Sequence, residues 1–113
     1  MVHKTSPFKI KDGMLLLTQE DLKRLPPLYS TEKIPIEEKV LQVKFFSPDS
    51  NWTWYAVEFD GKDRFFGYVK GFENEWGYFS MKELMASKGT LGLHIERDRY
   101  FTPTRFKDLK EFD

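Results

Sequence analysis

Three carboxylates in this sequence stand where they could share a catalytic task. Glu58 lies within an apolar, strand-like run, and Glu96 and Asp98 follow close together further along the chain. A carboxylate in a partly apolar recess can hold a raised pKa and transfer a proton. The pattern therefore allows a small carboxylate-dependent enzyme that uses Glu58 with Glu96 or Asp98. It also allows Glu58 to sit at an exposed hairpin end, or to pair with Arg97 or Arg99.

Other catalytic and metal-binding patterns are missing from the sequence. There is no cysteine, and the two histidines, His3 and His94, stand alone without HExxH or paired-histidine spacing. No GxSxG elbow, P-loop or GxGxxG is present. We therefore predict no metal, no cofactor and no catalytic residues, and identify no small-molecule substrate. A binding protein is favoured over an enzyme.

Basic and aromatic residues are interleaved near the C-terminal end of the sequence. This combination suits single-stranded nucleic acid, because cations contact phosphates and rings stack on bases. The neighbouring acids Asp98, Asp108 and Glu111 dilute the positive charge. A nucleic-acid-binding protein is thus an alternative prediction, with contacts from Arg97, Arg99, Tyr100, Arg105 and Lys107.

The composition limits the class of protein. A chain of 113 residues is long enough for one core and short for two. Its 18 basic and 18 acidic side chains cancel, so no global field favours a polyanion or a membrane. The longest aliphatic run covers residues 14–17, far below the roughly 18 apolar residues of a spanning helix. Without cysteine or such a run, the chain is predicted to be cytoplasmic.

The first part of the chain predicts an arm, a helix and a loop. Residues 1–13 contain several basic and few apolar side chains, which indicates a flexible N-terminal arm. Thr18 is a candidate N-cap followed by acidic residues, and Pro26 and Pro27 end the helix. Residues 30–39 are polar and interrupted by proline, which predicts a loop. A single α+β domain is expected over residues 14–113.

The rest of the chain predicts strands, turns and two further helices. Residues 40–46, 51–59 and 64–72 predict three strands, joined by turns at 47–50 and 60–63. Further strands are expected over residues 75–79 and 91–95. Ser80 and Glu83 form a capping-box pattern that opens a helix closed by Gly89, and Thr104 is expected to cap a last helix. The predicted fold is α+β, an antiparallel β meander of three to five strands with two or three short helices packed on it.

Side-chain alternation assigns these strands two faces. The face expected to form the core carries Leu41, Val43, Phe45, Trp52, Trp54, Ala56, Glu58, Phe65, Gly67 and Val69. The second face is half polar yet carries an aromatic cluster, so something should cover it. Either a terminal helix or the segment at Tyr100 and Phe101 packs there, or the cluster binds a protein partner or a second copy. Its candidate contacts are Tyr55, Phe59, Arg64, Phe66 and Tyr68.

Five segments of the sequence resemble one bacterial family. They are LPPLYSTE, VKFFSPDSNWTWYAVEFDG, FFGYVKG, GYFSMKEL and LGLHIERDRYF, and the likeness runs from about residue 15 to residue 109. The family is the uncharacterised domain-of-unknown-function family numbered two-nine-five-eight. Its members resemble cargo of plasmids and other mobile elements, which implies an accessory role in mobile-element biology. The resemblance carries over no catalytic residue.

The matching segments also supply polar site candidates. They are Asp49, Ser50, Asn51, Glu58, Glu96, Arg97 and Asp98. In a purely structural alternative, Asp49 and Ser50 stabilise their own turn, and residues 96–98 form an ion-pair cluster that pins the last segment to the sheet. The sequence favours a non-enzymatic accessory or regulatory binding protein of bacterial mobile elements that acts through a protein partner.

Overall fold

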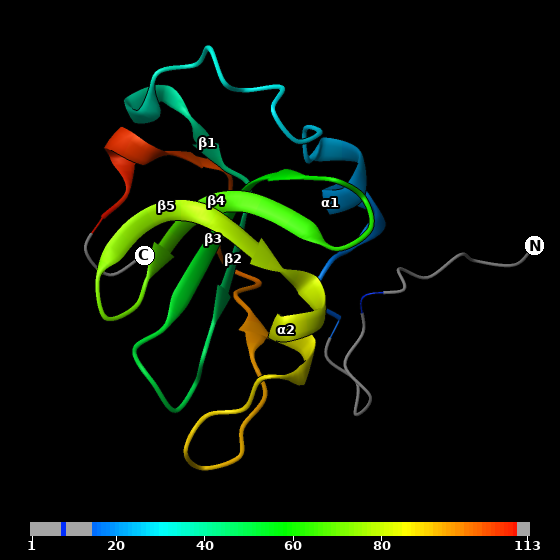
Figure 1. Ribbon diagram of the computed structural model, residues 1–113, viewed down its shortest axis with the longest axis vertical. Coiled ribbons are helices and arrows are strands. Elements are labelled where there is room, and N and C mark those ends of the chain that lie inside the picture. The colour runs from blue at the N-terminus through cyan, green and yellow to red at the C-terminus, as the bar shows by residue number, and fades with distance from the viewer. Residues whose placement is uncertain (1–7, 9–14, 111–113) are drawn as a thin grey trace, which may run out of the picture.

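Short helices flank a twisted antiparallel sheet in the computed structural model, which describes residue 8 and residues 15–110 (Figure 1). In chain order the elements are α1 (Gln19–Arg24), η1 (Ile36–Glu38), β1 (Val40–Leu41), β2 (Val43–Phe46), β3 (Thr53–Phe59), β4 (Arg64–Lys70), β5 (Asn74–Ser80), α2 (Met81–Ala86), β6 (Glu96–Arg97), β7 (Thr104–Arg105) and η2 (Phe106–Asp108). The elements η1 and η2 are single 3-10 turns. The predicted α+β fold is confirmed.

The main sheet has the strand order β5-β4-β3-β2-β6, and each neighbouring pair is antiparallel. Strands β2 to β5 follow one another as the predicted meander. The turn between β3 and β4 is closed by Asp60, whose carboxylate accepts hydrogen bonds from the N–H groups of Lys62, Asp63 and Arg64. Partial desolvation alone would raise the pKa of Asp60, but these bonds lower it.

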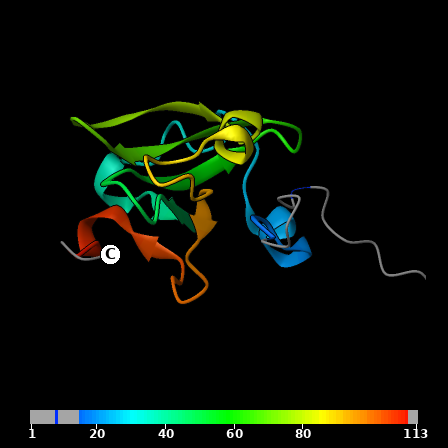
Figure 2. The same cartoon turned by 90° about the horizontal axis from the view of Figure 1, so that it is seen from below.

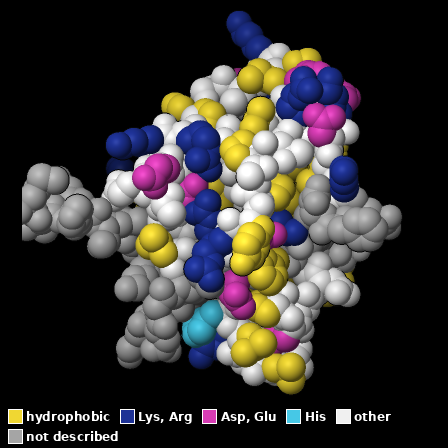
Figure 3. All heavy atoms as spheres, turned by 180° about the vertical axis from the view of Figure 1, so that it is seen from behind, with side chains coloured by type: hydrophobic (Ala, Val, Ile, Leu, Met, Phe, Trp, Pro, Cys, Tyr) yellow, Lys and Arg dark blue, Asp and Glu magenta, His cyan; other side chains and the backbone are white. Residues whose placement is uncertain are grey.

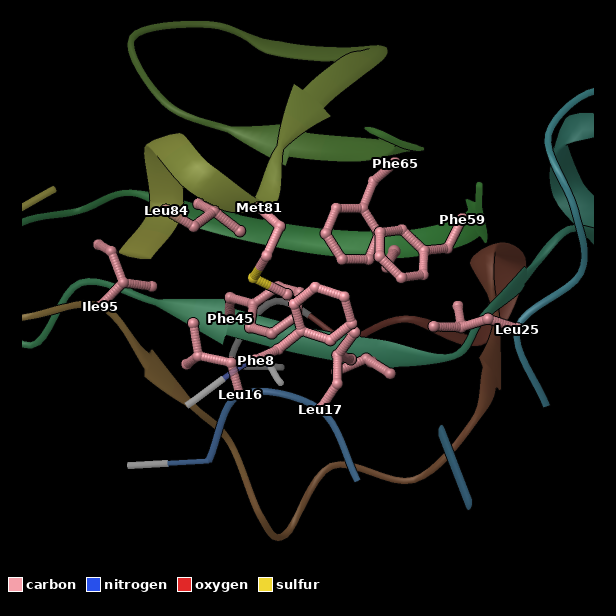
Figure 4. Close-up of a cluster of buried hydrophobic side chains, with 12 residues drawn as sticks. Phe8, Leu16, Leu17, Leu25, Phe45, Phe59, Phe65, Met81, Leu84 and Ile95 are labelled. Carbon is pink, nitrogen blue, oxygen red and sulfur yellow. The ribbon is translucent and has the colours of Figure 1, made fainter. Parts of the chain in front are cut away.

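The first face of the sheet carries the larger core (Figure 4). Phe65 lies at its centre, with ring centroids 4.3 Å from Phe59 and 5.7 Å from Phe45. The buried members are Phe8, Leu16, Leu17, Leu25, Val43, Phe45, Ala56, Phe59, Phe65, Met81, Leu84 and Ile95. The predicted N-terminal arm lies outside the described residues except at Phe8, which is buried in this core.

Both α-helices begin where the sequence predicts. Thr18 caps α1 in a complete capping box with Asp21, and the helix ends at Arg24, two residues before Pro26. Ser80 caps α2 by accepting a hydrogen bond from the Glu83 N–H. However, α2 ends at Ala86 rather than at Gly89, because the backbone at Ser87 is already extended (ψ 142°). The Ser87 N–H and hydroxyl both donate to the Glu83 carbonyl and so cap this end. Across the described part of the chain, no helix has the length and apolar character to span a membrane.

The C-terminal segment covers one end of the second face of the sheet. Leu41, Tyr55 and Val57 are buried there, and the cover consists of Phe101, Phe106 and Leu109. The pairing of β1 with β7 fixes this segment in place. One predicted alternative, cover by the chain itself, is therefore confirmed at this end. Thr104 lies in β7 instead of capping a helix. The C-terminal segment and α1 lie at opposite ends of the molecule (Figures 1 and 2).

A β-bulge in β3 corrects the predicted faces. The register with β4 shifts between Ala56 and Glu58, so Val57 is the extra residue. Beyond the bulge the alternation is reversed: Glu58 faces the second side, and Phe59 faces the first core. A side chain at Gly67 would collide with the β3 backbone here, which explains the glycine.

Two strand boundaries also differ from the prediction. The expected strand 40–46 is interrupted at Gln42, and Leu41 consequently belongs to the second cluster instead of the first. The expected strand 91–95 is a loop, and the strand is β6, Glu96–Arg97. The Asp49 carboxylate holds that loop by accepting hydrogen bonds from Leu91 N–H at 2.8 Å and Leu93 N–H at 3.4 Å.

Candidate functional site

A pocket of about 280 Å³ opens at the other end of the second face, between strands β4 and β5 and the segment of residues 29–39. Its walls are apolar or aromatic, and its polar side chains come mainly from β3 and the loop. The lining residues are Tyr29, Glu32, Ile36, Lys39, Glu58, Phe66, Trp76 and Tyr78. An apolar pocket with a few fixed polar groups is the usual form of a binding site.

Glu58 forms part of this pocket and ties the loop to the sheet. It is only 2% exposed. One carboxylate oxygen accepts a hydrogen bond from Tyr29 N–H at 2.8 Å, and the other accepts from Thr31 N–H at 2.9 Å and from the Thr31 hydroxyl. The bulge at Val57 is what turns Glu58 toward these donors. Glu58 is therefore neither at an exposed hairpin end nor paired with Arg97 or Arg99.

Lys39 also contacts Thr31, and its side chain is buried, with 6% of the residue exposed. Its Nζ donates to the Thr31 carbonyl at 2.5 Å and to the Thr31 hydroxyl oxygen at 3.4 Å. The Thr31 hydroxyl thus connects a buried ammonium to a buried carboxylate, and the two charges offset each other. Nζ also lies 5.9 Å from the centroid of the Phe66 ring. An ammonium has three N–H donors, so Lys39 can offer one to a group in the pocket.

Two tyrosines form the exposed rim of the pocket. Tyr29 is 55% and Tyr78 51% exposed, and their ring centroids are 6.4 Å apart. Tyr29 has a φ of 71°, a left-handed conformation that is strained for a bulky residue. The pKa of Tyr78 is raised, first by desolvation and next by the neighbouring Tyr29 hydroxyl. The negative charges of Glu58 and Glu32 raise it further. The surface of the rim is therefore mainly apolar, and the nearby carboxylates give it a weakly negative electrostatic potential.

The predicted partner-binding residues separate into two groups. Tyr55 is buried with its ring 5.6 Å from Phe101, and Tyr68 packs at 4.8 Å from Phe106. Phe59 lies in the first core. Phe66 remains in the pocket, and Arg64 is exposed with its guanidinium 5.7 Å from the Tyr78 ring. Of the five, Tyr55 and Phe59 are buried and Tyr68 is half-buried beside Phe106, so Phe66 in the pocket and the exposed Arg64 are best placed for a partner.

The predicted nucleic-acid contacts are mostly engaged in ion pairs. Arg97 forms a bidentate salt bridge with the buried carboxylate of Asp21. Arg105 and Lys107 both pair with Glu38, at 3.4 and 2.7 Å, and Arg105 also pairs with Asp108 at 3.2 Å. The pKa of Glu38 is lowered, chiefly by the hydrogen bond from Lys107. Desolvation opposes this shift, and the positive charges of Lys107 and Arg105 add to it.

Two members of this group, Arg99 and Tyr100, are exposed. On the back of the molecule, many Lys and Arg side chains lie close to Asp and Glu side chains (Figure 3). The structure therefore gives the nucleic-acid alternative little support, and it stays a prediction.

The polar candidates at the first turn have structural partners. The carboxylate of Asp49 holds the loop of residues 89–93, as described above, and the Ser50 hydroxyl accepts a hydrogen bond from the Trp52 N–H at 3.3 Å. Asn51 is exposed. Asp49 also accepts a hydrogen bond from the Ser47 hydroxyl at 3.2 Å, so it stabilises its own turn, as the structural alternative predicts, and a distant loop as well.

The proposed catalytic carboxylates do not share a site. Glu96 pairs with Phe46 in the sheet, and Phe46 lies opposite Thr53 at the start of β3. Five residues of extended strand separate Thr53 from Glu58, which is roughly 16 Å. Asp98 forms an ion pair with Lys44 at 3.5 Å. Within the described residues no cluster of three or more His, Asp and Glu side chains could hold a metal ion.

The family comparison matches most of the chain. A family model described as "Protein of unknown function (DUF2958)" matches residues 16–109. The chain belongs to this family. The resemblance inferred from the sequence is confirmed, while the DUF2958 description states no activity. No curated protein matches the chain, and neither does any solved structure.

All residues that line the pocket fall inside the DUF2958 match. Sequence reasoning found Glu58 and Phe66 but missed Tyr29, Lys39, Trp76 and Tyr78. Trp76 and Tyr78 had a usable signal, because they share the period-two spacing of the facing strand. The contributions of Tyr29 and Lys39 depend on how a polar loop folds back, and no local pattern specifies that.

Proposed function

We propose that this protein is a non-enzymatic binding module that recognises a protein partner through the pocket beside β5. The observation that carries the proposal is a preformed aromatic pocket with buried, mutually compensated charges. Glu58 and Lys39 hold the loop in place before any partner arrives, so little conformational entropy would be lost on binding. The exposed rings of Tyr29 and Tyr78 suit a protein interface, where tyrosine is enriched.

The wider setting is part of the same proposal. The likeness of family members to mobile-element cargo suggests an accessory or regulatory role in bacterial mobile elements. The absence of cysteine supports a cytoplasmic location. A partner in that setting would be a protein of the host cell or of the element itself.

Affinity capture from lysate with a matched pair of variants tests the proposal. Tyr78→Ala removes a rim ring from the pocket, whereas Tyr100→Ala removes an equally large ring that is 94% exposed and outside it. We expect wild type and Tyr100→Ala to retain the same protein, Tyr78→Ala to lose it, and nuclease treatment of the lysate to change nothing. Retention by Tyr78→Ala, or loss after nuclease treatment, would overturn the proposal.

A further inference from the structure

Strand β5 is an open edge of the sheet. It pairs with β4 on one side, and in the described part of the chain no strand pairs with its other side. In Figure 2 β5 forms the upper boundary of the molecule. Such an edge presents a row of N–H and C=O groups that can pair with another strand.

The hydrogen bonds of the neighbouring turns identify which groups point outward. Arg64 O accepts from Asp60 N–H, so Arg64 directs its backbone groups toward β3. Met81 N–H donates to Asp63 O, so the odd-numbered residues of β4 face β5. In an antiparallel ladder this direction alternates at every residue. The backbone groups of Gly77 and Phe79 therefore pair with β4, and those of Trp76 and Tyr78 point away from the sheet.

This edge lacks most of the features that usually prevent strand addition. Protected edges are short, or carry proline, charged side chains (lysine above all) or a bulge. β5 is seven residues long, has no lysine or proline, keeps its register with β4 along its whole length, and carries Glu75 as its one charged residue. A side chain built on Gly77 would meet nothing within 4 Å, so the first face of the sheet is uncovered at the middle of this strand.

The same two residues that present their backbone outward also line the pocket. The side chains of Trp76 and Tyr78 lie on the second face of the sheet beside Phe66. The centroid of the Phe66 ring is 5.9 Å from that of Trp76 and 5.3 Å from that of Tyr78. We propose that an extended segment of the partner protein adds to β5 as a sixth strand and places one bulky apolar side chain in the pocket. This inference rests on the proposed function, and assigns backbone pairing to β5 and side-chain recognition to the pocket.

The chemistry of the pocket and its surroundings specifies the partner segment further. A volume of about 280 Å³ lies below the roughly 300 to 1,000 Å³ of pockets that hold drug-sized molecules, and suits a single side chain. Glu32, Glu73 and Glu75 are exposed beside the pocket and strand, and form no ion pair within the described residues. Arg64, exposed over the Tyr78 ring, offsets one of these three negative charges. We therefore expect basic residues to flank the apolar one. A second copy of this chain fits less well, since its own β5 would bring the same acids.

Selection from a random linear peptide library tests the inference. Peptides are selected on the wild-type protein and counter-selected on Tyr78→Ala, with Tyr100→Ala as the matched control. The best peptide is then synthesised with single N-methyl groups, which remove one backbone donor at a time. We expect affinity to fall about tenfold or more at every second position, and to change less than threefold at the positions between.

Amide hydrogen exchange supplies an independent measurement on the protein alone. In the free protein the Trp76 and Tyr78 amides should exchange faster than those of Gly77 and Phe79, and the peptide should slow them. Equal protection of all four amides in the free protein would overturn the inference whatever the peptides do. Tyr78-dependent peptides without alternating N-methyl effects would overturn the added strand but leave the proposed function standing. A library without any Tyr78-dependent peptide would overturn both.

Discussion

The two ends of the aromatic face on β3 to β5 are built from the same residue types but differ in what lies over them. At the closed end, Tyr55 and Tyr68 are covered by Phe101 and Phe106 of the chain's own C-terminal segment. At the open end, Phe66 and Tyr78 border a pocket that the described residues leave unfilled. Aromatic residues on a strand therefore do not indicate by themselves whether a surface is core or interface. The cover decides, and it comes from residues far away in sequence.

The largest effect is expected at the buried carboxylate that holds the open end together. Glu58→Ala leaves the Tyr29 N–H, the Thr31 N–H and the Lys39 ammonium without their compensating acceptor or charge. It should lower the free energy of unfolding by about 3 to 4 kcal/mol. Urea unfolding of the variant measures this loss.

A double-mutant cycle separates the contribution of charge from that of loop anchoring. Glu58→Ala with Lys39→Met should cost less than the sum of the two single changes, because no buried charge then lacks its counterpart. Glu58→Gln, which keeps one acceptor oxygen, should fall between wild type and Glu58→Ala. A loss below about 1 kcal/mol for Glu58→Ala would show that the loop does not need this anchor.

The next largest effect distinguishes the closed end from the open end directly. Phe106→Ala removes a partly buried ring that contacts Tyr68 and Trp76, and should cost about 2 to 3 kcal/mol. Tyr78→Ala removes a ring that is half exposed, and should cost under about 1 kcal/mol. Chemical denaturation compares the two, and equal losses would mean that both ends belong to one core.

A smaller effect with an unusual sign is expected at the rim. At most positions in strands and helices, a protein with alanine is more stable than the same protein with glycine. At position 29 this order should reverse, because Tyr29 occupies the left-handed region. Tyr29→Gly should therefore be more stable than Tyr29→Ala by about 0.5 to 1 kcal/mol, while both lose the pocket wall. Thermal unfolding of the pair provides the measurement. If the alanine variant were the more stable, the strain at this position would be disproved.

The smallest effect concerns the Tyr78 hydroxyl. Its pKa should lie above the usual value of about 10, and should move back toward that value in Tyr29→Phe and Glu32→Gln. Because the folded-state pKa is the higher one, the associated stability is present below pH 10 and is lost as the pH rises through the folded value. NMR titration of the Tyr78 ring tests this, and a normal pKa in wild type would contradict it.

Local signals explain the parts of the fold that the sequence predicts. Thr and Ser are favoured at helix starts because their hydroxyl oxygens accept bonds from free N–H groups, as Thr18 and Ser80 do here. Pro26 cannot continue a helix, so both helix beginnings and one helix end are predictable. The turn at Asp60 is equally local, since its carboxylate bonds residues two to four positions ahead. The meander follows from these turns.

The parts that were predicted wrongly depend on single-residue changes of register. Nothing in the residues around Val57 marks a bulge, and one extra residue exchanges the faces of Glu58 and Phe59. That exchange removed Phe59 from the candidate interface and brought Glu58 to the loop that forms the pocket. The sequence places Lys39 in a polar loop and does not reveal its burial, because that burial depends on a contact with Thr31 that has no local signature.

The pairing of β1 with β7 has a consequence for the order in which the chain can fold during synthesis. Val40 pairs with Arg105, so the partner strand is made long after β1 itself. Strands β2 to β5 and α2 can form their hairpins earlier, since their contacts are local. Until the C-terminal segment emerges, Tyr55 and Tyr68 remain as uncovered as Phe66 and Tyr78. For that interval the nascent domain presents one continuous aromatic surface, and a chaperone that binds such surfaces would find its target there.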